Sequence, residues 1–160
     1  MPAAFIVLLS RMVFSRRRHL LILLAASLLY LVACQQPPET AKVIQIIDGD
    51  TIVVEGGYYV RYIGIDAPEK NEPFYLEAMR ANREMVMGRE VRLECDVSNE
   101  DKYGRLLRYV YVDSTFVNAE LVKQGYACAK AYPPDIKHQA DIEAMEEEAK
   151  QLCKGIWRQQ

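Results

Sequence analysis

The chain has four cysteines in 160 residues, and no two of them lie at the CxxC spacing that is typical of structural zinc sites. It has no internal repeat, which argues against a solenoid or propeller architecture. Its apolar content is 51% and its charged content is 26%, values that argue against a disordered chain. Together these features leave one compact domain of ordinary size as the expected architecture.

Net positive charge is also lacking. The chain has 20 basic and 22 acidic side chains, and four of the basic ones lie in residues 1–34, which contain no acid. The remaining residues carry 16 basic and 22 acidic side chains, a net charge of −6. A domain this acidic is not a general nucleic-acid binder. If it handles nucleic acid, it does so through a local basic site.

Residues 1–33 have the composition of a lipoprotein signal peptide. Three arginines at residues 16–18 precede a short apolar run over residues 20–31. That run is shorter than a membrane-spanning helix and suits a signal peptide. The segment ends Leu-Val-Ala-Cys, which resembles a bacterial lipobox, in which the peptidase cleaves before the cysteine and Cys34 takes a lipid. The alternative is an uncleaved helix that anchors the protein.

Either N-terminal arrangement places the domain outside the cytoplasm, tethered to a bacterial membrane at the periplasmic or cell-surface side. Residues 34–40 contain the cysteine and a polar, Pro-rich stretch that is expected to be an extended linker. The folded domain is predicted to span residues 41–158.

Three strands are expected at the start of this domain, over residues 42–47, 52–54 and 58–63, because β-branched and aromatic side chains dominate there. Asp48-Gly49 separates the first two, and it indicates either a hairpin turn or a bend within one long strand. We interpret Asp48 as the turn-forming residue and Asp50 as a metal ligand.

The stretch from Arg61 to Glu69, Arg-Tyr-Ile-Gly-Ile-Asp-Ala-Pro-Glu, is the most informative part of the sequence. It must end in a turn, because Pro68 has no N–H to donate. The strand therefore delivers one cation and two carboxylates to one sheet edge. Asp48 and Asp50 can approach Asp66 there, which would place three carboxylates near one point. Neighbouring carboxylates favour a hard-oxygen metal site, and an adjacent arginine favours a bound phosphate. The alternative is a surface turn with one ion pair.

The remaining elements follow from periodicity and from breaker residues. We expect, in order, a helix that Asn71 caps and Gly88 ends, a strand over residues 89–95, a strand over residues 106–112, a helix over residues 117–125, and a last helix that starts at Pro133. Cys95 is expected on the inward side of its strand, and the acidic side of the last helix is expected to be solvated. Short strands with one inserted helix predict a small closed barrel.

A second charged stretch, Asp101-Lys102-Tyr103-Gly104-Arg105, precedes the strand over residues 106–112. A Gly-Arg pair at a loop-to-strand junction projects a guanidinium from a rigid edge, which suits anion binding. The alternative is a solvated charged turn.

With these motifs the chain resembles the thermonuclease family, the secreted staphylococcal-type nucleases. The motifs that carry the resemblance, in the order of the family, are Asp48-Gly49-Asp50-Thr51, Arg61 with Asp66-Ala67-Pro68-Glu69, Asp101 to Arg105, Val117-Asn118 with Leu121-Val122 and Gly125, and Gly155-Ile156-Trp157. The resemblance covers about residues 41–158. It implies an α+β, mainly β fold, a five-stranded OB-like β-barrel with three helices.

The resemblance implies a calcium site and a general base. Asp50 and Asp66 match the calcium carboxylates of the family. Ala67 lies where a main-chain carbonyl binds the ion in the family; well-known members have Thr there, but a carbonyl ligand does not depend on the side chain. Glu69 matches the proposed general base.

The resemblance also implies a set of substrate contacts. Arg61 and Arg105 match the two arginines on the scissile phosphate and complete the catalytic set with Glu69. Lys102 and Tyr103 match the substrate-binding loop, and Tyr132 is the candidate for a nucleotide-stacking tyrosine. Stacking of this kind suits single strands.

The function that the resemblance implies is that of a calcium-dependent, extracytoplasmic endonuclease that cleaves DNA and RNA and leaves 3′-phosphates. Its partners would be nucleic acid and, through the lipid on Cys34, a membrane, and the protein is expected to be a monomer. The alternative is an inactive barrel that binds nucleic acid or protein without cutting. The presence of both carboxylates, the base and both arginines favours the enzyme.

The cysteines that remain after lipidation of Cys34 are odd in number, so at least one of them is expected to be a free thiol. Cys95 is expected to be a buried, inert side chain. Cys128 and Cys153 lie in segments that flank the last helix, and they are the candidate pair for a disulfide.

Overall fold

The computed structural model describes residues 37–158. The predicted signal peptide and the predicted lipidation site, Cys34, lie outside the described residues. Within residues 37–158, no helix is both long enough and apolar enough to cross a membrane.

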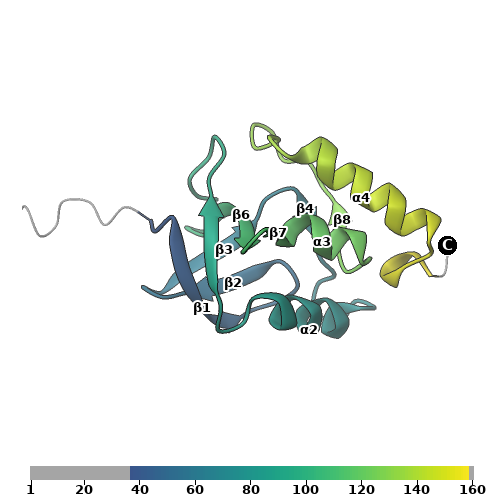
Figure 1. The fold of residues 1–160 in the computed structure, drawn as a ribbon, viewed down its shortest axis with the longest axis horizontal. Helices are drawn as coiled ribbons and strands as arrows, with labels where there is room; N and C mark the ends of the chain where they lie inside the picture. Colours follow the sequence, from purple (N-terminus) through teal and green to yellow (C-terminus); the bar gives the residue numbers. More distant parts are fainter. Residues whose placement is uncertain (1–36, 159–160) are drawn as a thin grey trace, which may run out of the picture. The chain divides into compact units, whose positions relative to one another are not determined.

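Five strands close into a barrel (Figure 1). They are β1 (Thr40–Ile46), β2 (Thr51–Val54), β3 (Tyr58–Tyr62), β5 (Glu90–Glu94) and β6 (Leu106–Val112). Their order is β3-β2-β1-β5-β6, and a parallel pairing between β3 and β6 closes the ring, while the other neighbours are antiparallel. Closure leaves none of the five strands as a free edge. The predicted α+β fold, a five-stranded barrel with three helices, is confirmed.

Strand β1 belongs to two parts of the barrel wall. Its first residues pair with β5, and its last residues pair with β2. A register shift between Val43 and Gln45 marks an irregularity where the strand passes from one partner to the other. Such a bulge bends a strand and lets a small sheet curve into a barrel.

The Asp48-Gly49 turn is a hairpin, because β1 and β2 pair with each other in antiparallel register. The Asp48 carboxylate accepts a hydrogen bond from the backbone N–H of Asp50 (3.0 Å), which is the role of a turn-forming Asx residue. The hairpin alternative for this turn is thus the one that the structure adopts.

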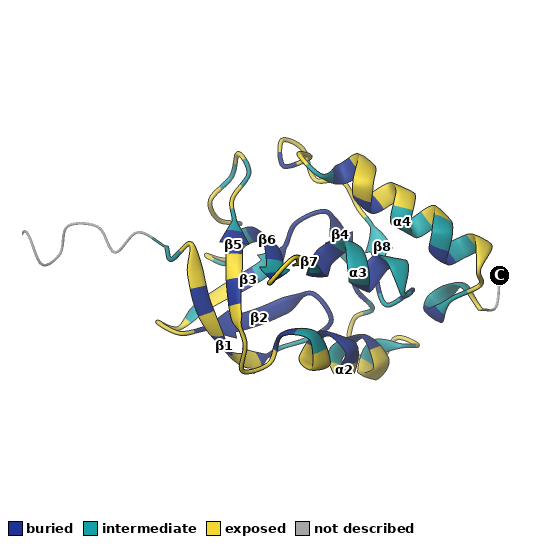
Figure 2. Cartoon of the chain, in the orientation of Figure 1, coloured by how far each residue is buried: buried dark blue, intermediate teal, exposed yellow. Residues whose placement is uncertain are grey.

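Helices and short strands cover parts of the barrel. The described helices are α2 (Tyr75–Val86), α3 (Val117–Lys123) and α4 (Gln139–Gln151), with a 3₁₀ turn η1 (Gly155–Trp157). Strand β7 (Thr115–Phe116) pairs antiparallel with the end of β6, and β4 (Ile65–Asp66) pairs antiparallel with β8 (Cys128–Ala129). Figure 2 shows that α2 and α4 each present buried residues on one side and exposed residues on the other.

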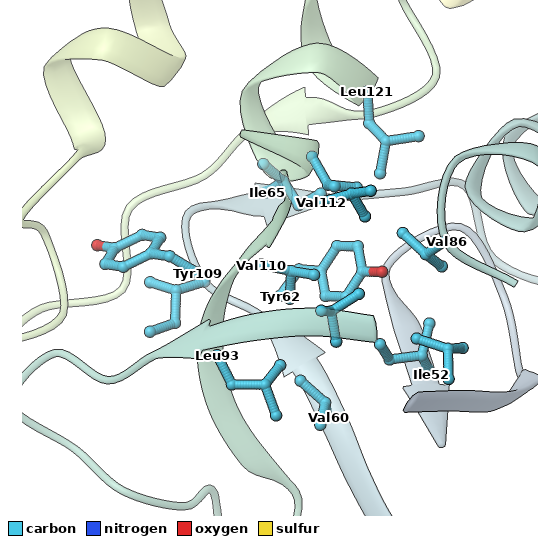
Figure 3. Packing of buried hydrophobic residues seen from close by; sticks show 14 of the residues in the cluster. Ile52, Val60, Tyr62, Ile65, Val86, Leu93, Tyr109, Val110, Val112 and Leu121 are labelled. Atoms are coloured by element: carbon cyan, nitrogen blue, oxygen red, sulfur yellow. The ribbon is translucent and has the colours of Figure 1, made fainter. Parts of the chain in front are cut away.

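The core fills the barrel and extends under the helices (Figure 3). Tyr62 and Tyr109 are its largest buried side chains. The buried Tyr62 hydroxyl donates to Asn82 Oδ1 of α2 (2.9 Å), and the Asn82 amide donates to the carbonyl of Asp48 (3.0 Å). This chain of bonds ties α2 to the hairpin that carries Asp50.

Several expected boundaries are wrong. Asn71 does not cap a helix, because α2 begins at Tyr75 and Asn71 has a left-handed φ of 76°. The last helix begins at Gln139 rather than Pro133. Cys95 is exposed, because β5 ends at Glu94 and the alternation of the strand no longer applies.

The predicted disulfide is also not formed. Cys95, Cys128 and Cys153 are all free thiols in the structure. Cys128 is half-buried in β8, whereas Cys153 is exposed after the end of α4. Cys128 precedes α4 and Cys153 follows it, and this arrangement does not bring the two sulfur atoms together.

Candidate active site

An open cleft of about 760 Å³ lies where the ends of the barrel strands meet the loops that follow β5 and β8. Its lining gathers almost all of the candidate residues from the sequence: Asp50, Arg61, Asp66, Glu69, Lys102, Tyr103, Arg105 and Tyr132. These residues come from parts of the chain as far apart as 82 positions in sequence, and the barrel brings them to one concave surface.

Arg61 lies at the centre of this cleft and is mostly buried, with a side chain 12% exposed. Its guanidinium contacts Asp50 Oδ2 (3.0 Å) and Asp66 Oδ1 (3.0 Å). The same guanidinium donates to the backbone carbonyls of Tyr62 and Ile65, each at 2.9 Å. So many fixed acceptors hold the cation in one orientation before any substrate binds.

Asp50 is 5% exposed and is held from three directions. Besides Arg61, its carboxylate accepts hydrogen bonds from the backbone N–H of Ala67 (2.8 Å) and from the hydroxyl of Thr51 (3.1 Å). Burial raises the pKa of Asp50 above its ordinary value, and the charge of Arg61 and the Ala67 N–H oppose that rise.

The preceding Gly49 makes this burial possible. A Cβ atom there would lie 2.6 Å from the Cβ of Ala67 and 2.9 Å from the Cβ of Ala78. The hairpin can therefore pack closely on the Asp66-Ala67 segment and on α2 only without a side chain at Gly49.

Asp66 receives two cations. Arg61 contacts its Oδ1, and Lys130 Nζ lies 2.6 Å from its Oδ2. Lys130 follows β8, and its backbone N–H donates to the carbonyl of Gly64 (2.8 Å). The hydrogen bond with Asp66 raises the pKa of Lys130 above its ordinary value, so this side chain is a cation at neutral pH.

Arg105 is positioned by Asp101. Its Nε and Nη2 atoms both lie 2.7 Å from Asp101 Oδ2, and the backbone N–H groups of Tyr103 and Arg105 donate to Asp101 Oδ1. Partial burial would raise the pKa of Asp101, but the hydrogen bonds from Arg105 and Tyr103 outweigh it and lower that pKa. The side chain of Arg105 is 31% exposed, so it remains accessible to an anion in the cleft.

Two exposed tyrosines line the cleft. Tyr103 is 72% exposed and Tyr132 is 46% exposed. Cations accompany both rings, because Lys102 and Arg105 lie 4.9 and 5.5 Å from the centroid of Tyr103, and Lys130 lies 5.4 Å from that of Tyr132. Exposed aromatic faces beside cations are suited to stacking with bases next to a charged backbone.

Glu69 lines the same cleft from the turn after β4 and is exposed. Its backbone N–H donates to Glu72 Oε2 (2.7 Å), and the N–H of Glu72 donates to the carbonyl of Glu69 (2.9 Å). This reciprocal pair fixes the backbone of the turn and leaves the Glu69 carboxylate at the surface of the cleft.

The donor atoms near Asp50 are of the right type for a hard divalent cation, since carboxylate oxygens are the ligands that such ions prefer. A buried carboxylate whose pKa is raised also gains from added positive charge. Residues 37–158 contain no group of three or more His, Cys, Asp or Glu side chains placed to hold a metal. A cation would therefore rely on Asp50, Asp66 and backbone or water oxygens.

Lys130 is the residue of this cleft that the sequence interpretation missed. Residues 126–132 read as a linking segment, and the pairing of β8 with β4, which brings Lys130 to Asp66, involves two residues on each strand. A weak signal was available, because Lys130 lies two positions before the candidate stacking residue Tyr132.

Comparison with known proteins finds nucleases among the relatives of this chain. The family described as "Staphylococcal nuclease homologue" matches residues 59–159. A thermonuclease of Staphylococcus hyicus is 39% identical over 128 residues, which cover 74% of this chain and 76% of that protein. A thermonuclease of Staphylococcus intermedius is 37% identical over 128 residues, with the same coverage of both chains. Endonuclease YncB of Bacillus subtilis is 40% identical over 122 residues, which cover 69% of this chain and 58% of that protein.

The chain therefore belongs to the staphylococcal nuclease family. The enzyme class predicted from the sequence, a nuclease that acts on nucleic acid, is confirmed.

Proposed function

We propose that this nuclease is a calcium-dependent endonuclease that cleaves both DNA and RNA and leaves 3′-phosphates. The observation that carries the proposal is the convergence of two preoriented arginines, two carboxylates and the exposed Glu69 in one cleft. Each group has a task in phosphodiester hydrolysis. The ion pairs of Arg61 with Asp50 and Asp66 hold three of the five together, and Arg105 and Glu69 line the same cleft from two other loops.

The arginines address the main obstacle to this reaction. A phosphodiester is already anionic, and its charge grows toward the pentacovalent transition state. Arg61 and Arg105 are fixed by carboxylates and carbonyls before the substrate arrives, so they stabilise that charge without reorganising. Calcium at Asp50, Asp66 and the carbonyl of Ala67 would supply further positive charge next to the scissile phosphate.

Glu69 is the proposed general base. Its carboxylate lies at the surface of the cleft, where it can orient a water molecule and take its proton. Tyr103 and Tyr132 would stack with bases beside the scissile linkage, and this arrangement favours single strands over duplexes.

The test uses single-stranded DNA and RNA of defined sequence, incubated with the purified protein in calcium or in excess chelator. The expected result is internal cleavage of both polymers in calcium, loss of cleavage in chelator, and products that carry 3′-phosphates, which a 3′-phosphatase converts to 3′-hydroxyls. Products with 3′-hydroxyls, or equal cutting in chelator, would contradict the corresponding part of the proposal.

We further propose that the enzyme acts as a monomer outside the cytoplasm, tethered to a bacterial membrane through a lipid on Cys34. The support is the cationic and apolar composition of residues 1–33 and the Leu-Val-Ala-Cys motif. Labelling of cells with a fatty-acid analogue should mark the wild-type protein and leave Cys34→Ser unlabelled. Equal labelling of both would remove Cys34 as the attachment site.

A further inference from the structure

Lys130 contacts Asp66, one of the two proposed calcium ligands, from a backbone position that hydrogen bonds fix. Residues 128–129 pair with β4, and the N–H of Lys130 donates to the carbonyl of Gly64 at 2.8 Å. The backbone of Lys130 is thus held at Gly64, two positions before Asp66, and its Nζ atom lies 2.6 Å from Asp66 Oδ2. This contact is a product of the fold rather than a chance meeting of two surface side chains.

Two carboxylates and two cations meet around Asp66. Asp50 and Asp66 provide two negative charges, while Arg61 and Lys130 provide two positive charges within 3.0 Å of carboxylate oxygens. Both oxygens of Asp66 already have a cationic partner. A divalent cation can therefore gain the full attraction of Asp66 only when one of these partners withdraws.

The two partners differ in their freedom to withdraw. Arg61 is 12% exposed and also donates to two backbone carbonyls. Lys130 is 49% exposed, and its ammonium is carried by a flexible four-carbon stem on the surface of the cleft. Lys130 is accordingly the partner that can leave at small cost.

We propose that Lys130 is a tethered counter-cation that occupies Asp66 Oδ2 when no divalent cation is bound, and that turns to the phosphate backbone of the substrate when one binds. This inference rests on the proposed calcium dependence. The destination is close, because Lys130 lies 5.4 Å from the ring of Tyr132, the proposed base-stacking residue, and both line the cleft.

This exchange couples the two ligands of the enzyme. Calcium at Asp66 would place two positive charges beside the Lys130 ammonium and repel it, whereas a phosphate would attract it. Nucleic acid therefore draws Lys130 away from Asp66 and strengthens calcium binding. By linkage, calcium strengthens nucleic-acid binding by the same factor.

The test is calorimetric titration of calcium into wild-type protein, Lys130→Met and Lys130→Gln, without nucleic acid. Because a unit charge a few ångströms from a divalent ion in a wet cleft contributes on the order of tenfold in affinity, both variants should bind calcium about tenfold more tightly. The matched control is Lys123→Met, which removes another surface lysine, one that pairs with Glu148 (3.6 Å) outside the cleft, and it should bind like wild type.

The second measurement repeats the calcium titration with a single-stranded phosphorothioate oligonucleotide present. The oligonucleotide should raise the calcium affinity of the wild type by a larger factor than that of Lys130→Met. Equal calcium affinity in the wild type and in both variants overturns the role of Lys130 and leaves the proposed function intact. Absence of calcium binding in all of them overturns the inference and the calcium dependence together.

Discussion

The buried carboxylate of Asp135 accepts a hydrogen bond from the backbone N–H of Ser98, with an N–O distance of 2.7 Å. Asp135 is 4% exposed and lies three positions after Tyr132, whose carbonyl accepts the N–H of Asp135 at 3.0 Å. Ser98 lies in the loop after β5 that leads to Tyr103. One hydrogen bond therefore joins the two loops that carry the exposed tyrosines of the cleft.

Replacing Asp135 by Ala should lower the free energy of unfolding by about 1–3 kcal/mol, because the Ser98 N–H then loses its acceptor in a partly buried position. Asp135→Asn keeps an acceptor oxygen and should cost less. Urea unfolding of both variants measures the difference. If Asp135→Ala is as stable as the wild type, the bond between the loops contributes nothing.

Arg61→Ala and Arg105→Ala should each reduce the rate of single-stranded DNA cleavage by about 10²–10³, the usual loss on removal of a preorganised donor to a transition-state oxyanion. A matched control is Arg80→Ala, which removes the same charge from the exposed surface of α2, away from the cleft lining. It should cut at the wild-type rate. Near-wild-type cutting by Arg61→Ala or Arg105→Ala would remove that arginine from its assigned role.

Glu94 should make stability depend on pH in the acid range. A hydrogen bond from Lys137 (2.7 Å), with others from His138 and Arg92, lowers the pKa of Glu94 from 4.5 to about 2 in the folded state. A group with a lowered folded pKa stabilises the fold above its unfolded pKa, and that contribution is lost as the pH falls through the folded pKa.

The wild type should therefore be more stable than Glu94→Gln by about 1 kcal/mol at pH 7. The difference should shrink as the pH falls from 4.5 toward 2. Unfolding free energies of both proteins at pH 7, 4 and 2.5 provide the comparison. A difference that stays constant over this range would show that the charge of Glu94 is not the cause.

Gly125 and Gly57 form a matched pair for the effect of close packing. Both have a left-handed φ, +77° and +81°, but a Cβ at Gly125 would lie 2.4 Å from the carbonyl oxygen of Lys154, whereas one at Gly57 meets nothing within 4 Å. Gly57→Ala should cost about 1–2 kcal/mol from its backbone conformation alone.

Gly125→Ala should lower the free energy of unfolding by about 1–3 kcal/mol more than Gly57→Ala does, because the segment before η1 must shift to make room for the Cβ. Thermal unfolding distinguishes the two variants. Equal losses of stability in the two variants would mean that the segment around Lys154 moves aside at no cost in free energy.

The barrel could be predicted from sequence because its strands are short, rich in β-branched and aromatic residues, and end at recognisable turns. Turn residues and strand-forming residues in the Arg61 to Glu69 stretch and around Asp48-Gly49 predict the local backbone. They therefore predict that Asp50, Arg61 and Asp66 lie close together, as the structure shows. The pairings that these rules use lie within one hairpin or its neighbour.

What the sequence did not reveal depends on contacts between distant segments. Helix α4 begins at Gln139, six residues later than predicted. Before it, Asp135 accepts the backbone N–H of Ser98 and Asp96 accepts that of Lys137, and hydrophobic periodicity does not predict such long-range hydrogen bonds. The acidic side of α4 was expected to be solvated, but Glu146 is half-buried and accepts the N–H of Ala129 (2.8 Å).

The most direct test of the whole account measures single-stranded DNA cleavage by the wild type, Glu69→Gln and Glu77→Gln in calcium and in chelator. Glu77 is an exposed carboxylate of α2 and serves as the charge-matched control. The proposed function predicts calcium-dependent cutting by the wild type and Glu77→Gln, and a loss of at least about 10² in the cutting rate of Glu69→Gln. Cutting by Glu69→Gln at the wild-type rate, or wild-type cutting that persists in chelator, would contradict it.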